Sequence, residues 1–195
     1  MHISEEALLE PIARYFRYMK GVAEIPKNKP LILADIGCGP KIRFYKFAQK
    51  NQIKIKQYFG IDPLAQDVEL KNVRLIRKPM SNAIPLPSGS VDILTGFAVL
   101  EHLNNPEDIM NDIFRVLKKD GKAIFTTPSK KSKKILEILC YKFNLISRRE
   151  LEEHKGYFDK ESILKLIKTN KKQAVFHSYF EFGWNNLIIL KKLPD

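Results

Sequence analysis

Residues 31–40, Leu-Ile-Leu-Ala-Asp-Ile-Gly-Cys-Gly-Pro, constrain the fold more than any other part of the chain. The short apolar run lies between Pro30 and Gly37, and these boundaries favour a buried strand over a helix. Gly37 and Gly39 then mark a tight turn, where the backbone bends sharply or closely approaches another group. Residues 42–48 continue as a helix. A strand, a glycine turn and a helix start together predict a site for a nucleotide-like ligand.

The size and composition of the chain predict one globular domain. It has 195 residues, 44% of them hydrophobic and 29% charged, which is enough for one substantial core. No apolar run reaches the roughly 18 residues of a membrane-spanning helix. Residues 1–6 lack the basic start and apolar core of a signal peptide, so we expect a cytoplasmic protein without a membrane span. The sequence does not determine the oligomeric state.

The cysteines and the charge balance limit the chemistry. Cys38 and Cys140 form neither a disulfide framework nor a metal-binding pattern, so we predict two reduced thiols and no metal site. The net charge is +12, with the excess leaning toward the C-terminal third. Such an excess steers an anionic substrate or a nucleic acid, or it is a solvated lysine-rich surface. We favour the solvated surface.

Strand and helix patterns alternate along the chain. The sequence predicts strands near residues 53–62, 73–77, 91–97 and 122–127, and helices near 5–20, 42–51, 106–121, 132–144 and 159–169. This alternation predicts an α/β fold, a doubly wound, mostly parallel, Rossmann-like sheet with helices on both faces. Two later strands, near residues 173–182 and 185–190, are too close in sequence to be parallel neighbours. We therefore expect a C-terminal antiparallel hairpin at a sheet edge.

Several residues are predicted to cap or end the helices of this pattern. Gly21 is predicted to end the first helix, and Asn105 to cap the helix that follows the fourth strand. Residues 118–121 are predicted to close that helix, and the lysine-rich residues 129–134 to form a mobile basic loop. Within the single domain 1–195, we expect an N-terminal helix and connector (1–29), a cofactor-binding core (30–128), and acceptor-side helices with the edge hairpin (129–195).

The glycine turn fits neither common phosphate-binding pattern. A dinucleotide fingerprint requires a third glycine, and Ile42 stands in its place. Asp35 would also repel a pyrophosphate. The Gly-Lys-Ser/Thr triplet of a P-loop does not occur in the sequence.

A ligand with an amino-acid end and a ribose fits better. Asp35 can accept hydrogen bonds from an ammonium group, directly or through water. Asp62 ends the second predicted strand, and its two carboxylate oxygens suit two vicinal ribose hydroxyls. Both aspartates would lie at the carboxyl ends of adjacent strands, where open parallel sheets bind ligands. These features describe S-adenosylmethionine (SAM).

Five segments in order resemble class I SAM-dependent methyltransferases, in the subgroup similar to ubiquinone- and menaquinone-pathway methyltransferases. They are residues 33–40, 60–62, 84–92, 99–103 and 115–121. The resemblance implies SAM as methyl donor and a set of cofactor-binding residues: Asp35, Gly37, Cys38 and Gly39 at the methionine end, Asp62 and Pro63 at the ribose, Met80, Ser81 and Asn82 at the adenine, and Phe97 near the methionine moiety. The chain departs from the family at Lys41, often a third glycine, and at Met80, often an acidic residue that bonds the adenine amine. Lower SAM affinity or a rearranged adenine loop would follow.

Two histidines are candidates for the chemistry. His102 follows the fourth strand at the active edge of the sheet and is the best internal candidate for a general base, if the acceptor must lose a proton. The alternative is that Glu101 and His102 are structural residues at a helix entry. His154 lies in a segment that resembles one covering the family's pocket, where it would contact acceptor or cofactor; otherwise it is a surface histidine.

The acceptor is less constrained than the cofactor. The Asn/Asp-Pro-Pro-Tyr motif of many nucleic-acid amino-methyltransferases is absent after the fourth strand, and no Pro-Cys pair offers a nucleophile for pyrimidine carbon. Residues 180–189 resemble the ends of methyltransferases from sugar-polymer biosynthesis. We expect in-line methyl transfer to a small-molecule or saccharide-like acceptor. The alternatives are a nucleic-acid-binding methyltransferase and a SAM-binding protein without catalysis.

Overall fold

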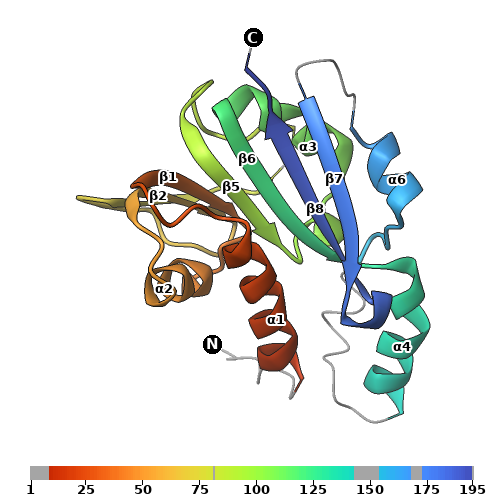
Figure 1. Cartoon of the computed structure of the whole chain (residues 1–195). Helices are drawn as coiled ribbons and strands as arrows, with labels where there is room; N and C mark the ends of the chain where they lie inside the picture. The colour runs from red at the N-terminus through yellow and green to blue at the C-terminus, as the bar shows by residue number, and fades with distance from the viewer. Residues whose placement is uncertain (1–8, 81, 143–153, 168–172, 195) are drawn as a thin grey trace.

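A computed structural model of the chain describes residues 9–80, 82–142, 154–167 and 173–194, and these form an eight-stranded sheet with helices on both faces (Figure 1). The strands are β1 (Leu31–Ile36), β2 (Ile55–Asp62), β3 (Val68–Leu70), β4 (Val73–Arg77), β5 (Val91–Phe97), β6 (Leu117–Pro128), β7 (Gln173–Phe180) and β8 (Asn185–Lys192). Their order is β3-β4-β2-β1-β5-β6-β8-β7.

The pairing confirms the predicted fold class. Strands β4, β2, β1, β5 and β6 are parallel neighbours. β8 runs antiparallel to β6 and β7 antiparallel to β8, so the C-terminal hairpin forms one edge of the sheet. The sequence pattern did not predict β3, which pairs antiparallel with β4 at the other edge. Its three residues are too few to show a periodic pattern.

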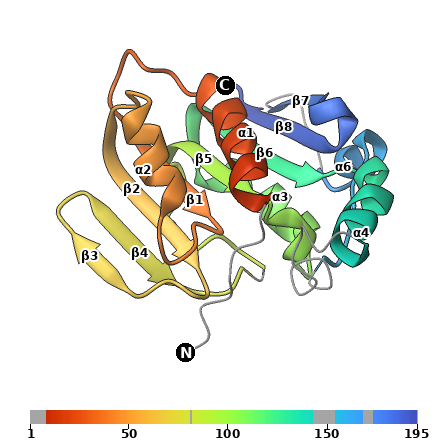
Figure 2. The ribbon, with the colours of Figure 1, turned by 90° about the horizontal axis from the view of Figure 1, so that it is seen from below.

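Two layers of helices cover the sheet (Figures 1 and 2). The helices are α1 (Glu10–Ala23), α2 (Arg43–Lys50), α3 (Pro106–Val116), α4 (Lys133–Tyr141) and α6 (Lys160–Lys165), with 3-10 turns η1 (Leu100–His102), η2 (Lys130–Ser132) and η3 (Glu181–Gly183). Alternate residues of β1 face opposite ways, as a strand requires. Leu31 and Leu33 pack in the core under α1 and α2, whereas Ala34 and Ile36 pack in the core under α3 and α6.

The first helix extends past its predicted end. Gly21 lies inside α1. A Cβ at this position would come within 2.4 Å of the Phe97 ring, so a larger residue would not fit. Glycine is used here for close packing and not as a stop signal. The portion of the predicted helix before residue 9 lies outside the described residues.

The helix after β5 starts as predicted but ends earlier. Asn105 occupies the N-cap position of α3 without a side-chain cap hydrogen bond. The backbone becomes extended at Leu117, which pairs with Val91 of β5. Residues 118–121 then form an irregularity within β6, and pairing with β5 resumes at Lys122. The prediction that residues 118–121 close the helix was wrong, because pairing with β5 overrides local helix propensity.

The lysine-rich segment 129–134 contains η2 and the start of α4, where a loop was predicted. The hydroxyl of Ser129 accepts a hydrogen bond from the amide of Ser132 and donates to the carbonyl of Gly183. Ser129 and Ser132 are both buried, and Lys133 opens α4. The contact with η3 therefore stabilises regular structure in a segment whose lysine-rich composition predicted a loop. No helix within the described ranges is both long and apolar enough to cross a membrane.

Candidate functional site

The carboxyl ends of β1 and β2 bring the two predicted aspartates to the same edge of the sheet. The strands are parallel, with Asp35 paired to Gly60 and Ile36 to Ile61. The amide of Gly37 still donates to the carbonyl of Ile61, at 2.8 Å, so the glycine turn starts directly from the ladder. This is the edge at which open parallel sheets bind ligands.

Asp62 holds the turn in place. One of its carboxylate oxygens accepts the amide of Gly39 at 2.9 Å, and the other accepts the amide of Leu64 at 2.7 Å. The side chain is largely buried, and each oxygen keeps a second lone pair for a further donor. The carboxylate is therefore pre-positioned beside the turn.

Asp35 lies deeper than the sequence suggested. It is 2% exposed, and its two oxygens accept the hydroxyls of Thr95 at 2.7 Å and Tyr58 at 3.1 Å. Burial, and to a smaller extent the nearby Asp62, raise the pKa of Asp35 to about 7, against the opposing effect of the Thr95 and Tyr58 hydroxyls. No local sequence pattern marks Tyr58 and Thr95 as partners of Asp35, because the three residues lie on three different strands.

The two glycines of the turn serve different purposes. Both have positive φ, +71° at Gly37 and +64° at Gly39. A Cβ at Gly37 would come within 2.8 Å of Val99, whereas a Cβ at Gly39 would meet nothing within 4 Å. The backbone at Gly39 is thus open to a ligand. Lys41, at the position where the family often has a third glycine, is exposed. The next residue, Ile42, adopts the left-handed backbone conformation, with φ +42°.

Cys38 is buried between these glycines, and burial raises the pKa of its thiol. The thiol is therefore part of the packing under the turn and is kept protonated. Cys140 on α4 is also buried and unbridged.

The predicted adenine and ribose residues lie along the loops after β2 and β4. Pro63 and Asn82 are exposed, and Met80 packs partly against the core. Ser81 lies outside the described residues. Leu64, which the sequence analysis did not single out, is 73% exposed next to the Asp62 carboxylate. Its place two residues after Asp62, at the end of the second predicted strand, is the sequence signal that could have identified it.

Phe97 turns its ring away from the turn toward the helices. It contacts Phe44 at 4.5 Å and Tyr18 at 5.2 Å between ring centroids, and it packs on Gly21. Its side chain therefore anchors α1 and α2 to the end of β5. The residue remains partly exposed at the end of β5.

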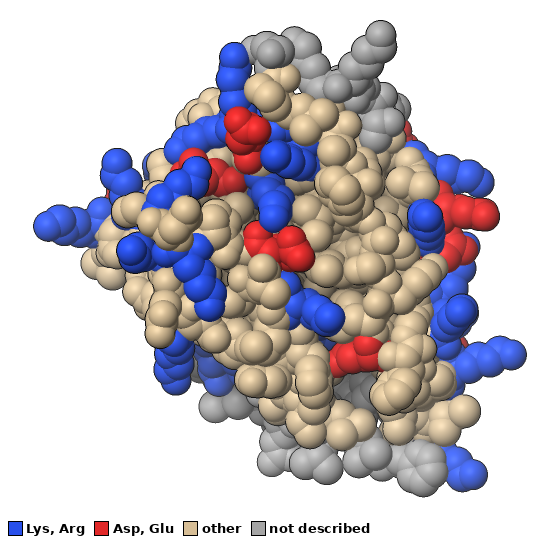
Figure 3. All heavy atoms as spheres, in the orientation of Figure 1, with Lys and Arg blue, Asp and Glu red and all other residues tan. Residues whose placement is uncertain are grey.

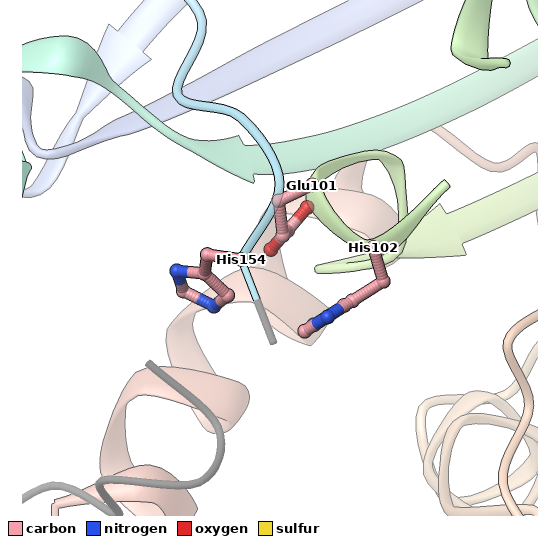
Figure 4. Close-up of side chains that lie close together, drawn as sticks. All are labelled: Glu101, His102 and His154. Carbon is pink, nitrogen blue, oxygen red and sulfur yellow. The ribbon is translucent and has the colours of Figure 1, made fainter. Parts of the chain in front are cut away.

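The two candidate histidines lie together, although 51 residues separate them in sequence. The rings of His102 and His154 have centroids 5.1 Å apart in an edge-on arrangement, and both residues are partly buried. Glu101, between them in Figure 4, is buried and accepts the hydroxyl of Thr127 at 3.0 Å. Burial raises the pKa of Glu101.

A cavity of about 590 Å³ opens beside His154. Its wall is basic and aromatic, and comprises Lys130, Lys133, Glu137, Tyr141, His154, Lys155, Gly156 and Tyr157. Burial raises the pKa of the Tyr157 hydroxyl to about 12. The cavity is an open hollow, lined by the residues after β6 and by the segment before α6, which are two parts of the predicted acceptor side.

Comparison with known proteins agrees with this geometry. A family model described as a methyltransferase domain matches residues 8–170. The ubiquinone/menaquinone biosynthesis C-methyltransferase UbiE of Campylobacter jejuni strain 81-176 is 27% identical over 193 residues, an alignment that covers 85% of this chain and 80% of UbiE.

Solved structures share the fold at low sequence identity. The plantazolicin methyltransferase BpumL, solved with S-adenosylhomocysteine (SAH), superimposes with a TM-score of 0.69 at 13% identity, covering 94% of this chain and 85% of BpumL. A SAM-dependent methyltransferase from Mesorhizobium loti gives a TM-score of 0.64 at 12% identity, covering 90% of this chain and 98% of that one. The matched family model and the shared fold agree with the ordered motifs: the chain belongs to the methyltransferase-domain family and is a SAM-dependent methyltransferase.

Proposed function

We propose that this methyltransferase acts on a small-molecule or saccharide-like acceptor that carries a hydroxyl and an anionic group. The observation that carries the proposal is the cavity of about 590 Å³ beside His154. Its volume falls within the roughly 300–1,000 Å³ of small-molecule sites. Lys130, Lys133 and Lys155 in its wall, against one glutamate, favour an acceptor with a carboxylate, phosphate or sulfate group.

Each of these lysines contacts a neighbouring side chain. Lys130 pairs with Asp159 at 2.7 Å, and Lys155 donates to the side-chain oxygen of Asn104 at 2.6 Å. Lys133 lies 5.9 Å from the centre of the Tyr157 ring. Because Asp159 offsets the charge of Lys130, the attraction for an anionic group rests mainly on Lys133 and Lys155.

The cofactor would lie across the ends of β1, β2 and β5. The backbone at Gly37 and Gly39 would face the methionine end, and Asp62 would accept the ribose hydroxyls with its remaining lone pairs. Leu64 and Met80 offer apolar surface to the adenine ring. Asp35 would act from beneath the turn, as a buried charge that favours the ammonium and sulfonium groups of SAM.

Methyl transfer places few chemical demands on the protein. The sulfonium of SAM supplies a good leaving group, so the main tasks are to align the acceptor with the methyl group and to exclude water. Val99 packs against Gly37, which puts η1 directly beside the turn. His102 and His154 would therefore lie between the cofactor edge and the acceptor cavity.

The alternative of a nucleic-acid acceptor rests on the net charge of +12. In Figure 3, Lys and Arg side chains gather over the upper left of the visible face and along its right margin, with a few Asp and Glu side chains among them. The cavity beside His154, and not this distribution of charge, favours a small acceptor.

The test is a methyl-transfer assay across acidic saccharides, neutral saccharides, short RNA and DNA, and a quinone-type acceptor, the last because the UbiE relatives are named as C-methyltransferases. SAH release and a mass gain of one methylene unit report transfer. We expect transfer to an acidic hydroxyl compound, and a higher KM when Lys133→Met removes one lysine of the cavity. Transfer to RNA or DNA with no small-molecule product would contradict the proposal.

A further inference from the structure

The side chains of Glu101, His102 and His154 converge on one small space (Figure 4). Each offers a ligand atom, and these atoms all lie within 4.8 Å of one another. Glu101 and His102 come from η1 after β5, and His154 comes from the segment before α6. Ligand atoms around one tetrahedral ion lie about 3.4 Å apart, so a contraction of at most about 1.4 Å would bring the three atoms to that spacing.

The two segments are tied together at this point. The amide of Lys155 donates to the carbonyl of Glu101 at 2.7 Å, which holds the residue after His154 against η1. The hydroxyl of Thr127, at the end of β6, donates to one Glu101 oxygen. The cluster is therefore built on three separate parts of the fold and is not a chance encounter of surface side chains.

One carboxylate oxygen of Glu101 is buried without a hydrogen-bond donor among the described residues. This oxygen is Oε1, and the residue as a whole is 1% exposed. A buried carboxylate oxygen without a partner is costly, and a bound cation would satisfy it. The favourable charge near Glu101 comes first from His102 and more weakly from Arg17. One terminal nitrogen of Arg17 is hydrogen-bonded to Glu10, and its Nε is buried without a partner among the described residues.

The imidazole of His154 is oriented as a metal ligand requires. Its Nδ1 lies 3.1 Å from the hydroxyl of Tyr157. A hydrogen bond to one ring nitrogen fixes the tautomer and the ring orientation of a histidine that ligates a metal through the other nitrogen. Tyr157 would serve as this positioning residue.

We propose that Glu101, His102 and His154 bind one divalent first-row transition-metal ion, of the Zn²⁺, Co²⁺ or Mn²⁺ type, and that this ion takes an oxygen of the acceptor. Two imidazoles and one carboxylate suit such ions better than Mg²⁺ or Ca²⁺, which prefer oxygen ligands. Three protein ligands leave positions open for substrate. The assignment revises the expectation of no metal site, and the acceptor role rests on the proposed function.

The ion would act without redox change. A bound acceptor hydroxyl loses its proton to water more readily, because the cation stabilises the oxygen anion. That oxygen then forms a bond to the methyl carbon of SAM, the carbon–sulfur bond breaks, and its electron pair stays on sulfur to give neutral SAH. His102 then serves as a ligand and not as a general base.

The test is direct metal binding by the full chain. After treatment with EDTA and its removal, Co²⁺ is titrated and followed by visible absorption and by calorimetry. We expect one equivalent to bind with the spectrum of a site containing histidine nitrogens. Glu101→Gln, His102→Gln and His154→Gln should each weaken binding by roughly tenfold or more. His177→Gln is the matched control, because His177 pairs with Asn186 on β8 and lies outside the cluster.

Separate titration with SAM distinguishes the two proposals. Wild-type protein that binds SAM but not Co²⁺, Zn²⁺ or Mn²⁺ would overturn the metal site and leave the proposed function standing. Equal Co²⁺ binding by His154→Gln and His177→Gln would also overturn it. Because Glu101→Gln alters a buried residue, His154→Gln, at a partly buried position, keeps the test decisive if the first variant fails to fold.

Discussion

The carboxylate of Asp62 accepts the amide of Gly39 at 2.9 Å, so the last residue of β2 fastens the turn that follows β1. The two residues lie 23 positions apart in sequence and meet only because their strands are parallel neighbours. The same carboxylate that is expected to hold the ribose therefore also shapes the backbone expected to hold the methionine end. Loss of Asp62 should affect both ends of the cofactor site.

Replacement of Asp62 should weaken SAM binding. A hydrogen bond to a charged group contributes about 1.5–3 kcal/mol, so Asp62→Ala should lower SAM affinity by roughly 10- to 100-fold, measured by calorimetry. Asp92→Ala is the matched control. Asp92 also accepts a backbone amide, that of Ile32, at the start of β1 and thus at the opposite end of the strand from the glycine turn. Equal SAM affinities for the two variants would contradict the assignment.

The buried Asp35 should make stability depend on pH. Its folded-state pKa is raised from 3.8 to about 7, so the folded protein retains a proton that the unfolded chain has lost. The stabilising contribution of the protonated group is complete below about pH 4 and is lost as pH rises to about 7. By linkage, the loss is on the order of 4 kcal/mol. Asp35→Asn should therefore gain stability relative to wild type over this window, measured by urea unfolding. Parallel pH profiles would show that Asp35 does not titrate there.

The same shift predicts proton release on SAM binding. The ammonium and sulfonium groups favour the ionised form of Asp35, so binding near pH 6 should expel a proton. Calorimetry in buffers of different ionisation enthalpy measures the number of protons released. We expect close to one for wild type and a clear reduction in Asp35→Asn; an unchanged number would exclude Asp35 as the source.

Alanine substitutions at Gly37, Gly39 and Gly89, which all have positive φ, can distinguish the cost of backbone strain from the loss of a ligand contact. Alanine in this conformation costs about 1 kcal/mol wherever it occurs. Gly37→Ala should cost more, because its Cβ would overlap Val99, and Val99→Ala should recover part of the loss. Gly39→Ala and Gly89→Ala have open space and should lose similar stability in thermal unfolding. Of these two variants, only Gly39→Ala should also lose SAM affinity; an equal effect at Gly89 would contradict a cofactor role for the turn.

Substitutions at Thr126 and Thr127, which are adjacent on β6, test whether the Thr127 hydroxyl stabilises the buried carboxylate of Glu101. The hydroxyl of Thr127 donates to the buried carboxylate, whereas Thr126 Oγ1 is buried without a partner among the described residues. Thr127→Val should destabilise the protein by about 1–3 kcal/mol in urea unfolding, because it leaves a carboxylate oxygen without its donor. Thr126→Val should be neutral or stabilising. The reverse order would mean that Thr127 does not support the carboxylate.

Local patterns predicted most of the fold. The parallel core and the C-terminal hairpin follow from apolar runs, glycines and prolines close together in sequence, and the structure confirms them. The errors occurred where distant contacts override local propensity. Pairing of Leu117 with β5 ends the helix before residues 118–121, Gly21 packs against Phe97, and residues 129–134 contact η3.

For the site, the sequence by itself determined the glycine turn and the two aspartates at strand ends, because strand, turn and helix signals are local and parallel strands end at a common edge. It also determined the methyltransferase family, through motifs in order. Only the tertiary structure decided that Asp35 is buried against Tyr58 and Thr95, and that His154 meets Glu101 and His102 beside a basic cavity. Such encounters depend on how strands and loops far apart in the chain pack, and the burial that perturbs a carboxylate exists only once that packing is complete.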